Sequence, residues 1–287
     1  MPLPYFERRV KAMAKKVTTT PTTEHTRQFV KCFERLRGRH NAFNAFSDFL
    51  AVSAISISNA VNPNDEREQE YMRIINKYNG EEKDLLAEIF GCIVNEMQPA
   101  EGVKPRYYDV LGELFGGLQL HDSWKGQFFT PQNVSDMMAL MTIGDSEETI
   151  ARRGYISMLE PCIGGGANVI GVVNAMFQRG YNPCKQLLVI GYDLDPRCVH
   201  MSYIHLSLMG VPAMIQQRNS LSGETYSDYW FTPVFALDDW AGRLRLERLA
   251  GIMRGFIADV EKEKAVAEIT TPPVVNPKPK FEQLTLF

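Results

Sequence analysis

The sequence predicts a mixed α/β fold, with a parallel sheet in the second half of the chain and helices in the first half. Three observations predict it. Between about residues 123 and 240, short β-rich runs alternate with helical stretches, as in a parallel sheet with crossover helices. From about residue 24 to 122 the apolar residues recur at helical spacing. A glycine-rich segment follows the first β-rich run, as in folds whose sheet edge binds a ligand.

Composition excludes several classes of protein. The 287 residues are 45% hydrophobic and carry a formal charge of −3, which excludes a uniformly basic DNA-coating protein. No apolar run is long enough to span a membrane, and we expect a cytoplasmic protein without membrane contacts. The five cysteines form no Cys-x-x-Cys pair, so neither disulfides nor a metal site is predicted.

We expect four parts along the chain. Residues 1–23 form a basic flexible arm, which either touches nucleic-acid phosphates or is a solvated extension. Residues 24–122 form a helical domain, and residues 123–267 form the domain with the sheet. Residues 268–287 form a flexible tail, because four prolines prevent a regular element there.

The elements of the sheet domain follow from its β-rich and helical runs. The expected strands are 156–159, 187–192, 213–216 and 229–237, and the expected helices are 167–179, 196–209 and 239–267. In the helical domain, the stripe from Leu85 to Val94 and the cluster of Phe43, Phe46 and Phe49 are predicted core.

A ligand site is predicted where the first strand ends. Residues 159–166 read Leu-Glu-Pro-Cys-Ile-Gly-Gly-Gly and lead into a helix, and glycines let a backbone turn sharply and approach a ligand closely. The second strand ends near Asp193, whose carboxylate can accept hydrogen bonds from both hydroxyls of a ribose. The other interpretation, an acid that caps the next helix, fits Asp195 better, because Pro196 follows it.

Three stretches in this order resemble the amino-methylating, adenine-N6 DNA methyltransferases, especially the modification subunits of type I restriction systems. They are Gly126-Gln127-Phe128-Phe129-Thr130-Pro131, Glu160 to Gly166, and Arg218-Asn219-Ser220-Leu221. The resemblance implies a Rossmann-like, S-adenosylmethionine-dependent methyltransferase fold with a truncated sheet. It also implies a set of cofactor contacts, namely Phe129, Thr130, Glu160, Pro161, Gly164, Gly166, Asp193 and Asn219. Asn219 replaces the family's aspartate and keeps an acceptor oxygen.

The catalytic motif that the resemblance implies is altered. The family has Asn/Asp-Pro-Pro-Tyr/Phe at the end of its fourth strand, where it holds the flipped adenine. Here Thr232, Pro233, Val234 and Phe235 stand in its place, and only Pro233 and Phe235 match. Loss of one well-placed acceptor costs on the order of 100-fold in rate. The family's remaining strands have no evident counterpart in the sequence.

The last five residues resemble the peptide by which bacterial proteins dock on the DNA sliding clamp. Gln283, Leu284, Leu286 and Phe287 carry this resemblance, and Thr285 is the variable position. We expect the apolar side chains to enter a groove of the clamp and Gln283 to form hydrogen bonds at its rim. The alternative is a tail that covers a patch of its own domain.

Three functions remain open at this stage. The first is a DNA-associated, cofactor-binding methyltransferase-like protein that is catalytically degenerate and recruited by the clamp. The second is an active adenine-N6 methyltransferase that works with a partner specificity subunit. The third is a structural adaptor without a cofactor.

Overall fold

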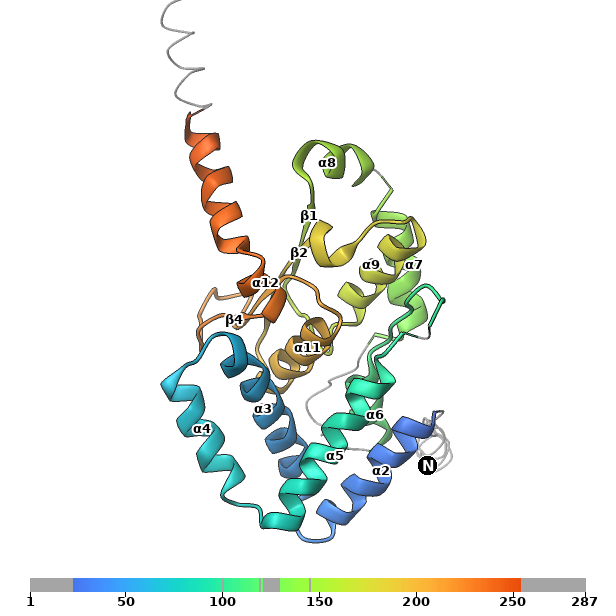
Figure 1. Ribbon diagram of the computed structural model, residues 1–287, viewed down its shortest axis with the longest axis vertical. Coiled ribbons are helices and arrows are strands. Elements are labelled where there is room, and N and C mark those ends of the chain that lie inside the picture. Colours follow the sequence, from blue (N-terminus) through green and yellow to red (C-terminus); the bar gives the residue numbers. More distant parts are fainter. Residues whose placement is uncertain (1–22, 100, 119, 121–129, 145, 254–287) are drawn as a thin grey trace, which may run out of the picture. The chain divides into compact units, whose positions relative to one another are not determined.

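The computed structural model describes residues 23–99, 101–118, 120, 130–144 and 146–253. By its internal contacts the chain divides into two units, residues 1–240 and 241–287. The first unit holds all the strands that are described (Figure 1). The described residues of the second unit, 241–253, are helical, as expected for the start of the 239–267 helix. Within the described ranges, no helix has the length and apolarity needed to cross a membrane.

The N-terminal part of the first unit is helical, as predicted. Each of its helices begins after a Thr, Asn or Asp whose side chain accepts the amide N–H three residues later, which satisfies one orphan donor of the first turn. The helices are α2 (Glu24–Arg37), α3 (Ala42–Val61), α4 (Asp65–Ile75), α5 (Gly80–Glu96) and α6 (Val110–Gly117).

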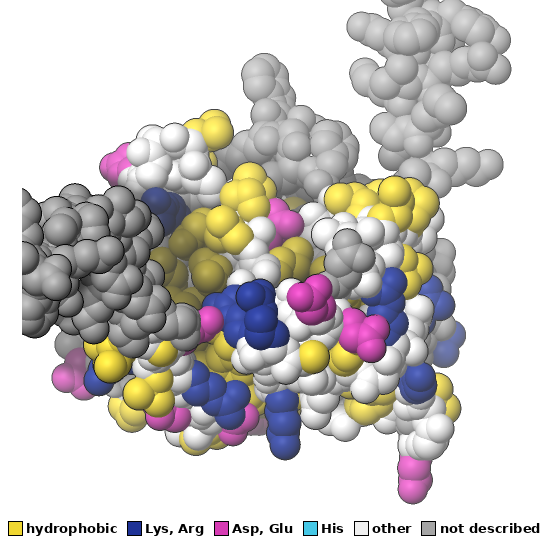
Figure 2. Space-filling model, turned by 90° about the horizontal axis from the view of Figure 1, so that it is seen from above, with side chains coloured by type: hydrophobic (Ala, Val, Ile, Leu, Met, Phe, Trp, Pro, Cys, Tyr) yellow, Lys and Arg dark blue, Asp and Glu magenta, His cyan; other side chains and the backbone are white. Residues whose placement is uncertain are grey.

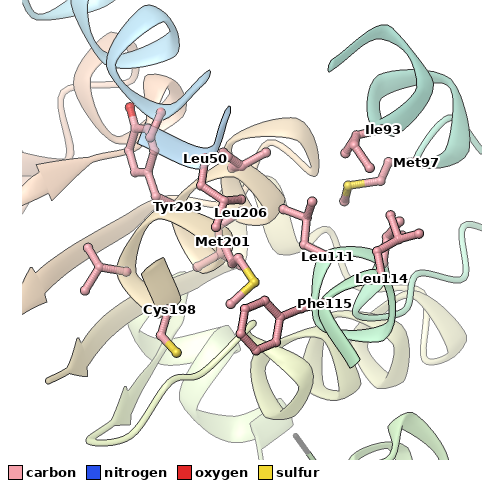
Figure 3. Close-up of a cluster of buried hydrophobic side chains, with 14 of the residues drawn as sticks. Leu50, Ile93, Met97, Leu111, Leu114, Phe115, Cys198, Met201, Tyr203 and Leu206 are labelled. Carbon is pink, nitrogen blue, oxygen red and sulfur yellow. The ribbon is translucent and has the colours of Figure 1, made fainter. Parts of the chain in front are cut away.

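The core joins this helical part to the sheet. Phe29, Phe33, Phe46 and Phe49 are buried and meet edge to face or stacked, with ring centroids 5.8 to 6.3 Å apart. Figure 3 shows how the cluster continues from α3, α5 and α6 onto α11 (Pro196–Leu208). The two parts therefore share one hydrophobic core.

The predicted mixed α/β class is confirmed, with a sheet of four described strands in the order β1-β2-β3-β4. The strands β1 (Ile156–Glu160), β2 (Leu187–Asp193) and β3 (Ala213–Gln217) are parallel, at the places that the sequence predicts. Two crossover helices connect them, α9 (Ala167–Gln178) and α11, again as predicted, and a short helix α10 (Pro183–Gln186) precedes β2. As expected, the Asp195 side chain caps α11 by accepting the Arg197 N–H.

The expected fourth strand over 229–237 is wrong in length and direction. The strand β4 covers only Trp230–Phe231 and runs antiparallel to β3, with Met214 paired to Phe231. The helix α12 (Pro233–Leu237) replaces the rest of the expected strand. Pro233 occupies the first helical position, where its fixed φ suits a helix and its missing N–H costs nothing.

Two helices precede β1, α7 (Gln132–Thr142) and α8 (Ser146–Arg153). The helix α7 lies against α9 at a crossing that requires a glycine, because a Cβ on Gly171 would be 2.7 Å from the Ser135 carbonyl oxygen. This close approach fixes α7 over the start of α9, where Gln132 donates to the Ala167 carbonyl oxygen.

Candidate functional site

The structure brings three of the predicted cofactor residues to one edge of the sheet. Glu160 is the last residue of β1 and Asp193 the last of β2, and Asn219 follows the end of β3 by two residues. Since these strands are parallel, all three polar side chains belong to the carboxyl edge, where α/β folds bind their ligands.

The glycine loop between β1 and α9 has the backbone that its sequence suggests. Gly164 and Gly166 have φ values of +56° and +98°, in the left-handed region that favours glycine. Gly166 is the residue before α9, so the loop delivers the chain to the amino end of a twelve-residue helix. Amide N–H groups at such an end attract negative or electron-rich ligand atoms.

Asp193 is held by this loop. Its carboxylate accepts the Gly164 N–H at 2.9 Å and the Asp195 N–H at 2.9 Å, one on each oxygen. Burial raises its pKa, and the Asp195 carboxylate adds to that rise, whereas the two amides oppose it. Each carboxylate oxygen has a second lone pair, so Asp193 retains capacity to accept ligand hydroxyls.

Glu160 lies at the start of α9, on the side that faces α7. The Glu160 carboxylate accepts the Cys162 N–H at 3.2 Å and the Asn168 side-chain N–H at 3.1 Å. The side-chain oxygen of Asn168 accepts a hydrogen bond from the Ser135 hydroxyl of α7 at 2.9 Å. Thr130 is exposed and precedes α7 by two residues. The beginnings of α7 and α9 therefore meet beside Glu160.

The loop after β3 is tied to the same site. Arg218 N–H donates to the Asp193 carbonyl oxygen at 2.8 Å, and the Ser220 hydroxyl donates to the Pro161 carbonyl oxygen. The Asn219 side-chain oxygen accepts the amides of Leu221 and Ser222, at 3.0 and 3.2 Å. This oxygen, the expected acceptor for an adenine amine, is thus already used in a turn.

Sequence reasoning missed Asp109 and His205, a buried pair that contacts the glycine loop. The Leu111 N–H donates to His205 Nε2 at 3.3 Å, so Nδ1 carries the proton and donates to the Gly165 carbonyl oxygen at 2.7 Å. Asp109 Oδ1 accepts the Gly112 N–H at 2.7 Å, while Oδ2 has no hydrogen-bond partner in the described structure. Burial raises the Asp109 pKa and lowers that of His205.

An aromatic group beside Asp193 was also missed. The hydroxyls of Tyr192 and Tyr229 are 3.3 Å apart, and the Arg218 guanidinium lies 4.9 Å from the Tyr192 ring centre. Tyr192 belongs to β2 and precedes Asp193, so its place could be read from the sequence. Arg218 follows β3 and comes beside Tyr192 through the pairing of β2 with β3, whereas Tyr229 joins only through the antiparallel turn of β4, which the sequence does not reveal.

The three predicted catalytic residues are not brought to this edge. Because β4 is antiparallel, Thr232 lies beside Ala213, at the amino end of β3. It is fully buried, and its hydroxyl donates to the Val211 carbonyl oxygen at 2.8 Å and accepts the Ala213 N–H at 2.9 Å. Pro233 begins α12, and the Phe235 ring stacks on Phe231 at 4.9 Å.

Five predicted site residues lie outside the described residues. They are Phe129 and the four clamp-peptide residues Gln283, Leu284, Leu286 and Phe287.

Fold and site together define a mixed α/β chain with a glycine loop and acidic side chains at the carboxyl edge of a mainly parallel sheet. No protein-family model matches the sequence, and neither does any curated protein. A solved structure that it resembles is the methyltransferase subunit of a type I restriction-modification system from Streptococcus thermophilus. The two are 15% identical with a TM-score of 0.35, over 70% of this chain and 59% of the other, so this chain matches less than two thirds of that subunit.

Proposed function

We propose that this chain binds S-adenosylmethionine at the glycine loop and acts at DNA as a methyltransferase-like protein that does not itself methylate adenine. The observation that carries the proposal is the 2.9 Å hydrogen bond from the Gly164 N–H to Asp193. It joins the glycine loop to Asp193, 29 residues further along the chain, which are the two parts of the predicted ligand site.

The residues present fit such a cofactor in most respects. The loop has no side chains at Gly164 and Gly166, so a ligand can approach the backbone there. Asp193 keeps free lone pairs for ribose hydroxyls. Glu160 borders the loop, since its carboxylate accepts the Cys162 N–H. Asn219 fits less well, because its oxygen already accepts two amides. When bound, the cofactor supplies a sulfonium methyl group.

The position of Thr232 supports the loss of catalysis. An adenine amine needs an acceptor close to the methyl donor, but the Thr232 hydroxyl makes two hydrogen bonds inside the core at the opposite edge of the sheet. Thr232→Asn, which restores the residue type of the family, is therefore expected to destabilise the fold and to produce no activity. Adenine methylation by this variant would contradict the positional argument.

Calorimetric titration of the full chain with S-adenosylmethionine tests binding. Asp193→Asn should weaken binding at least tenfold, because an amide presents one acceptor oxygen in place of two and loses the negative charge. Asp84→Asn is the matched control, since this exposed residue of α5 makes the same chemical change far from the loop. No binding by the unaltered chain would favour an adaptor without cofactor and refute the proposal.

Transfer of labelled methyl groups to adenine-containing DNA tests the second part. We expect no transfer by the chain alone. Transfer that appears only with a specificity subunit would favour the second function, an active methyltransferase completed by a partner. The sheet supports this alternative in one respect, since β1 has no neighbour on its outer side among the described strands.

We also propose that the protein reaches DNA through the sliding clamp. This recruitment depends on the resemblance of residues 283–287 to clamp-binding peptides, and it can hold or fail independently of cofactor binding.

A further inference from the structure

The fully buried His205 of α11 connects the helical part of the first unit to the glycine loop. Its Nδ1–H donates to the Gly165 carbonyl oxygen at 2.7 Å, and its Nε2 accepts the Leu111 N–H of α6 at 3.3 Å. Among the described residues, no histidine is visible on the face that Figure 2 shows. Figure 3 shows Leu111 in one cluster with Met201 and Leu206 of α11. One side chain therefore joins a helix 94 residues before it to a loop 40 residues before it.

Asp109 contacts the same glycine of the loop. This buried residue caps α6 by accepting the Gly112 N–H at 2.7 Å, and its Oδ1 lies 3.8 Å from His205 Nδ1. A Cβ on Gly165 would be 2.2 Å from Asp109 Oδ2, so the main chain of the loop lies directly against the carboxylate. Oδ2 has no hydrogen-bond partner among the described residues. A buried polar atom in that state needs an explanation, and its contact with the loop provides one.

Both residues also satisfy the beginning of α6, because the first amides of a helix have no partner within it. Asp109 accepts one of these N–H groups, and His205 accepts that of Leu111. An apolar residue at position 205 would suit its surroundings, since both of its neighbours in α11 are fully buried hydrophobic residues. It would leave the Leu111 N–H and the Gly165 carbonyl oxygen without this partner. The helix and the loop that His205 connects therefore explain why a polar residue is buried here.

The orientation of Gly165 determines that of its neighbours. Because a peptide unit is planar, the direction of the Gly165 carbonyl also sets the direction of the Gly166 N–H, which donates to the Ile163 carbonyl oxygen at 2.8 Å. On the other side of Gly165, the Gly164 N–H donates to Asp193 at 2.9 Å. Glycines allow the backbone many conformations, so three in succession need such contacts to keep a single one.

We propose that His205 and Asp109 are positioning residues of the candidate site, which hold Gly165 and thereby orient the glycine loop and Asp193. His205 ties the Gly165 carbonyl oxygen to α11, and Asp109 fills the space into which the main chain at this position would otherwise move. A loop that is ordered before binding lowers the entropic cost of binding a ligand. The ordering of the loop stands by itself, whereas its effect on cofactor affinity rests on the proposed function.

Calorimetric titration with S-adenosylmethionine tests the effect on affinity. His205→Leu removes both hydrogen bonds and should weaken binding roughly tenfold or more. His205→Gln should recover most of this loss, because a carboxamide is both a donor and an acceptor. Asp109→Ser keeps a side-chain cap on α6 but withdraws the carboxylate from Gly165, and it should weaken binding roughly threefold or more.

His200→Leu is the matched control for these variants. It makes the same change in the same helix, at a side chain that packs against Trp230, with ring centres 5.0 Å apart, and not against the loop. We expect its affinity for the cofactor to stay within about twofold of that of the unaltered chain. Far-UV circular dichroism verifies that each variant folds, and Asp109→Ser decides the question if His205→Leu does not.

Hydrogen exchange of the chain without cofactor measures the loop directly. Protection of the Gly164 amide should fall roughly tenfold or more in His205→Leu and, by a smaller factor, in Asp109→Ser. The reference is the Val189 amide, which donates to the Pro212 carbonyl oxygen inside the sheet and should change less. Equal losses of protection at both amides would indicate general destabilisation and would overturn the positioning role.

The outcomes separate this inference from the proposed function. If the unaltered chain binds no cofactor, the proposed function fails, and the exchange comparison alone decides whether His205 and Asp109 position the loop. If the unaltered chain binds the cofactor and the folded His205→Leu and Asp109→Ser variants bind it equally well, the positioning role is wrong and the proposed function stands.

Discussion

At the scale of single residues, Gly165 is the position where the candidate site depends most directly on a missing side chain. A Cβ there would be 2.2 Å from Asp109 Oδ2, and Asp109 cannot easily move, because it is buried and caps α6. We expect Gly165→Ala to lower the free energy of unfolding by about 1–3 kcal/mol through overpacking. Urea denaturation measures this loss.

A matched control and a second variant isolate the cause. Gly91 lies inside α5, and the place that a Cβ would take there has no other atom within 4 Å, so Gly91→Ala should stabilise by about 0.5–1 kcal/mol. In an Asp109→Ala background the clash is absent, and Gly165→Ala should cost clearly less. Additive losses in this cycle would mean that Asp109 is not the cause.

A second residue-scale prediction concerns acid stability. His200 packs edge-on against Trp230 at 5.0 Å and faces the Arg67 and Asp195 side chains. Burial lowers its pKa to about 4, below the unfolded value of 6.5, and Arg67 adds to the shift while Asp195 opposes it. The folded state therefore binds fewer protons than the unfolded state between these values, and stability present above pH 6.5 is lost as pH falls through 4.

We expect this group to contribute on the order of 1–3 kcal/mol to the loss of stability between pH 7 and pH 4. The pKa of His205 is also lowered by burial, so it contributes in the same direction. His200→Gln should show a smaller loss of stability over this range in urea titrations at several pH values. An unchanged pH dependence would contradict the assignment.

At the scale of elements, the join between β4 and α12 carries a further prediction. Thr232→Val keeps the shape but removes the hydroxyl that serves the Val211 carbonyl and the Ala213 N–H. Because both groups are then left buried without this partner, the free energy of unfolding should fall by about 1–3 kcal/mol. The exposed Thr225→Val is the control, with a change expected within about 0.5 kcal/mol.

The same variant separates a structural role from a role in the site. Since Thr232 lies at the amino edge of the sheet and Asp193 at the carboxyl edge, cofactor affinity of folded Thr232→Val should equal that of the unaltered chain. Calorimetric titration measures it. Weakened binding at full folding would indicate that Thr232 reaches the site.

This junction also shows where prediction from the sequence ends. The runs at β1, β2 and β3 are bounded by glycine turns and separated by helical stretches, so periodicity alone locates them. The run from 229 to 237 is apolar and aromatic throughout, and such a run fits a strand or a buried helix equally well. Pro233 was the local signal for the helix, because it favours a first helical position.

At the scale of the whole molecule, the candidate site was predictable only in its local parts. Asp193 ends a strand and Gly164 and Gly166 follow one, and parallel strands bring such positions to one edge. Asp109 was recognisable at most as a helix cap, since its contact with Gly165 joins residues 56 positions apart. The partner set of Thr232 likewise depends on the direction of β4, which is determined by tertiary pairing and not by local sequence.

The last prediction concerns recruitment of the whole protein. If Gln283, Leu284, Leu286 and Phe287 dock on the sliding clamp, a purified bacterial clamp should bind the full chain with micromolar-class affinity in a calorimetric titration. Deleting residues 283–287 should abolish binding, and Leu284→Ala or Phe287→Ala should weaken it at least tenfold, because each removes an apolar anchor from the groove. Thr285→Ala should bind like the unaltered chain, since this position varies in the resembled peptide. Equal affinity for the full chain and the deletion variant would exclude the clamp as the route to DNA, and the proposal of cofactor binding would stand independently of that result.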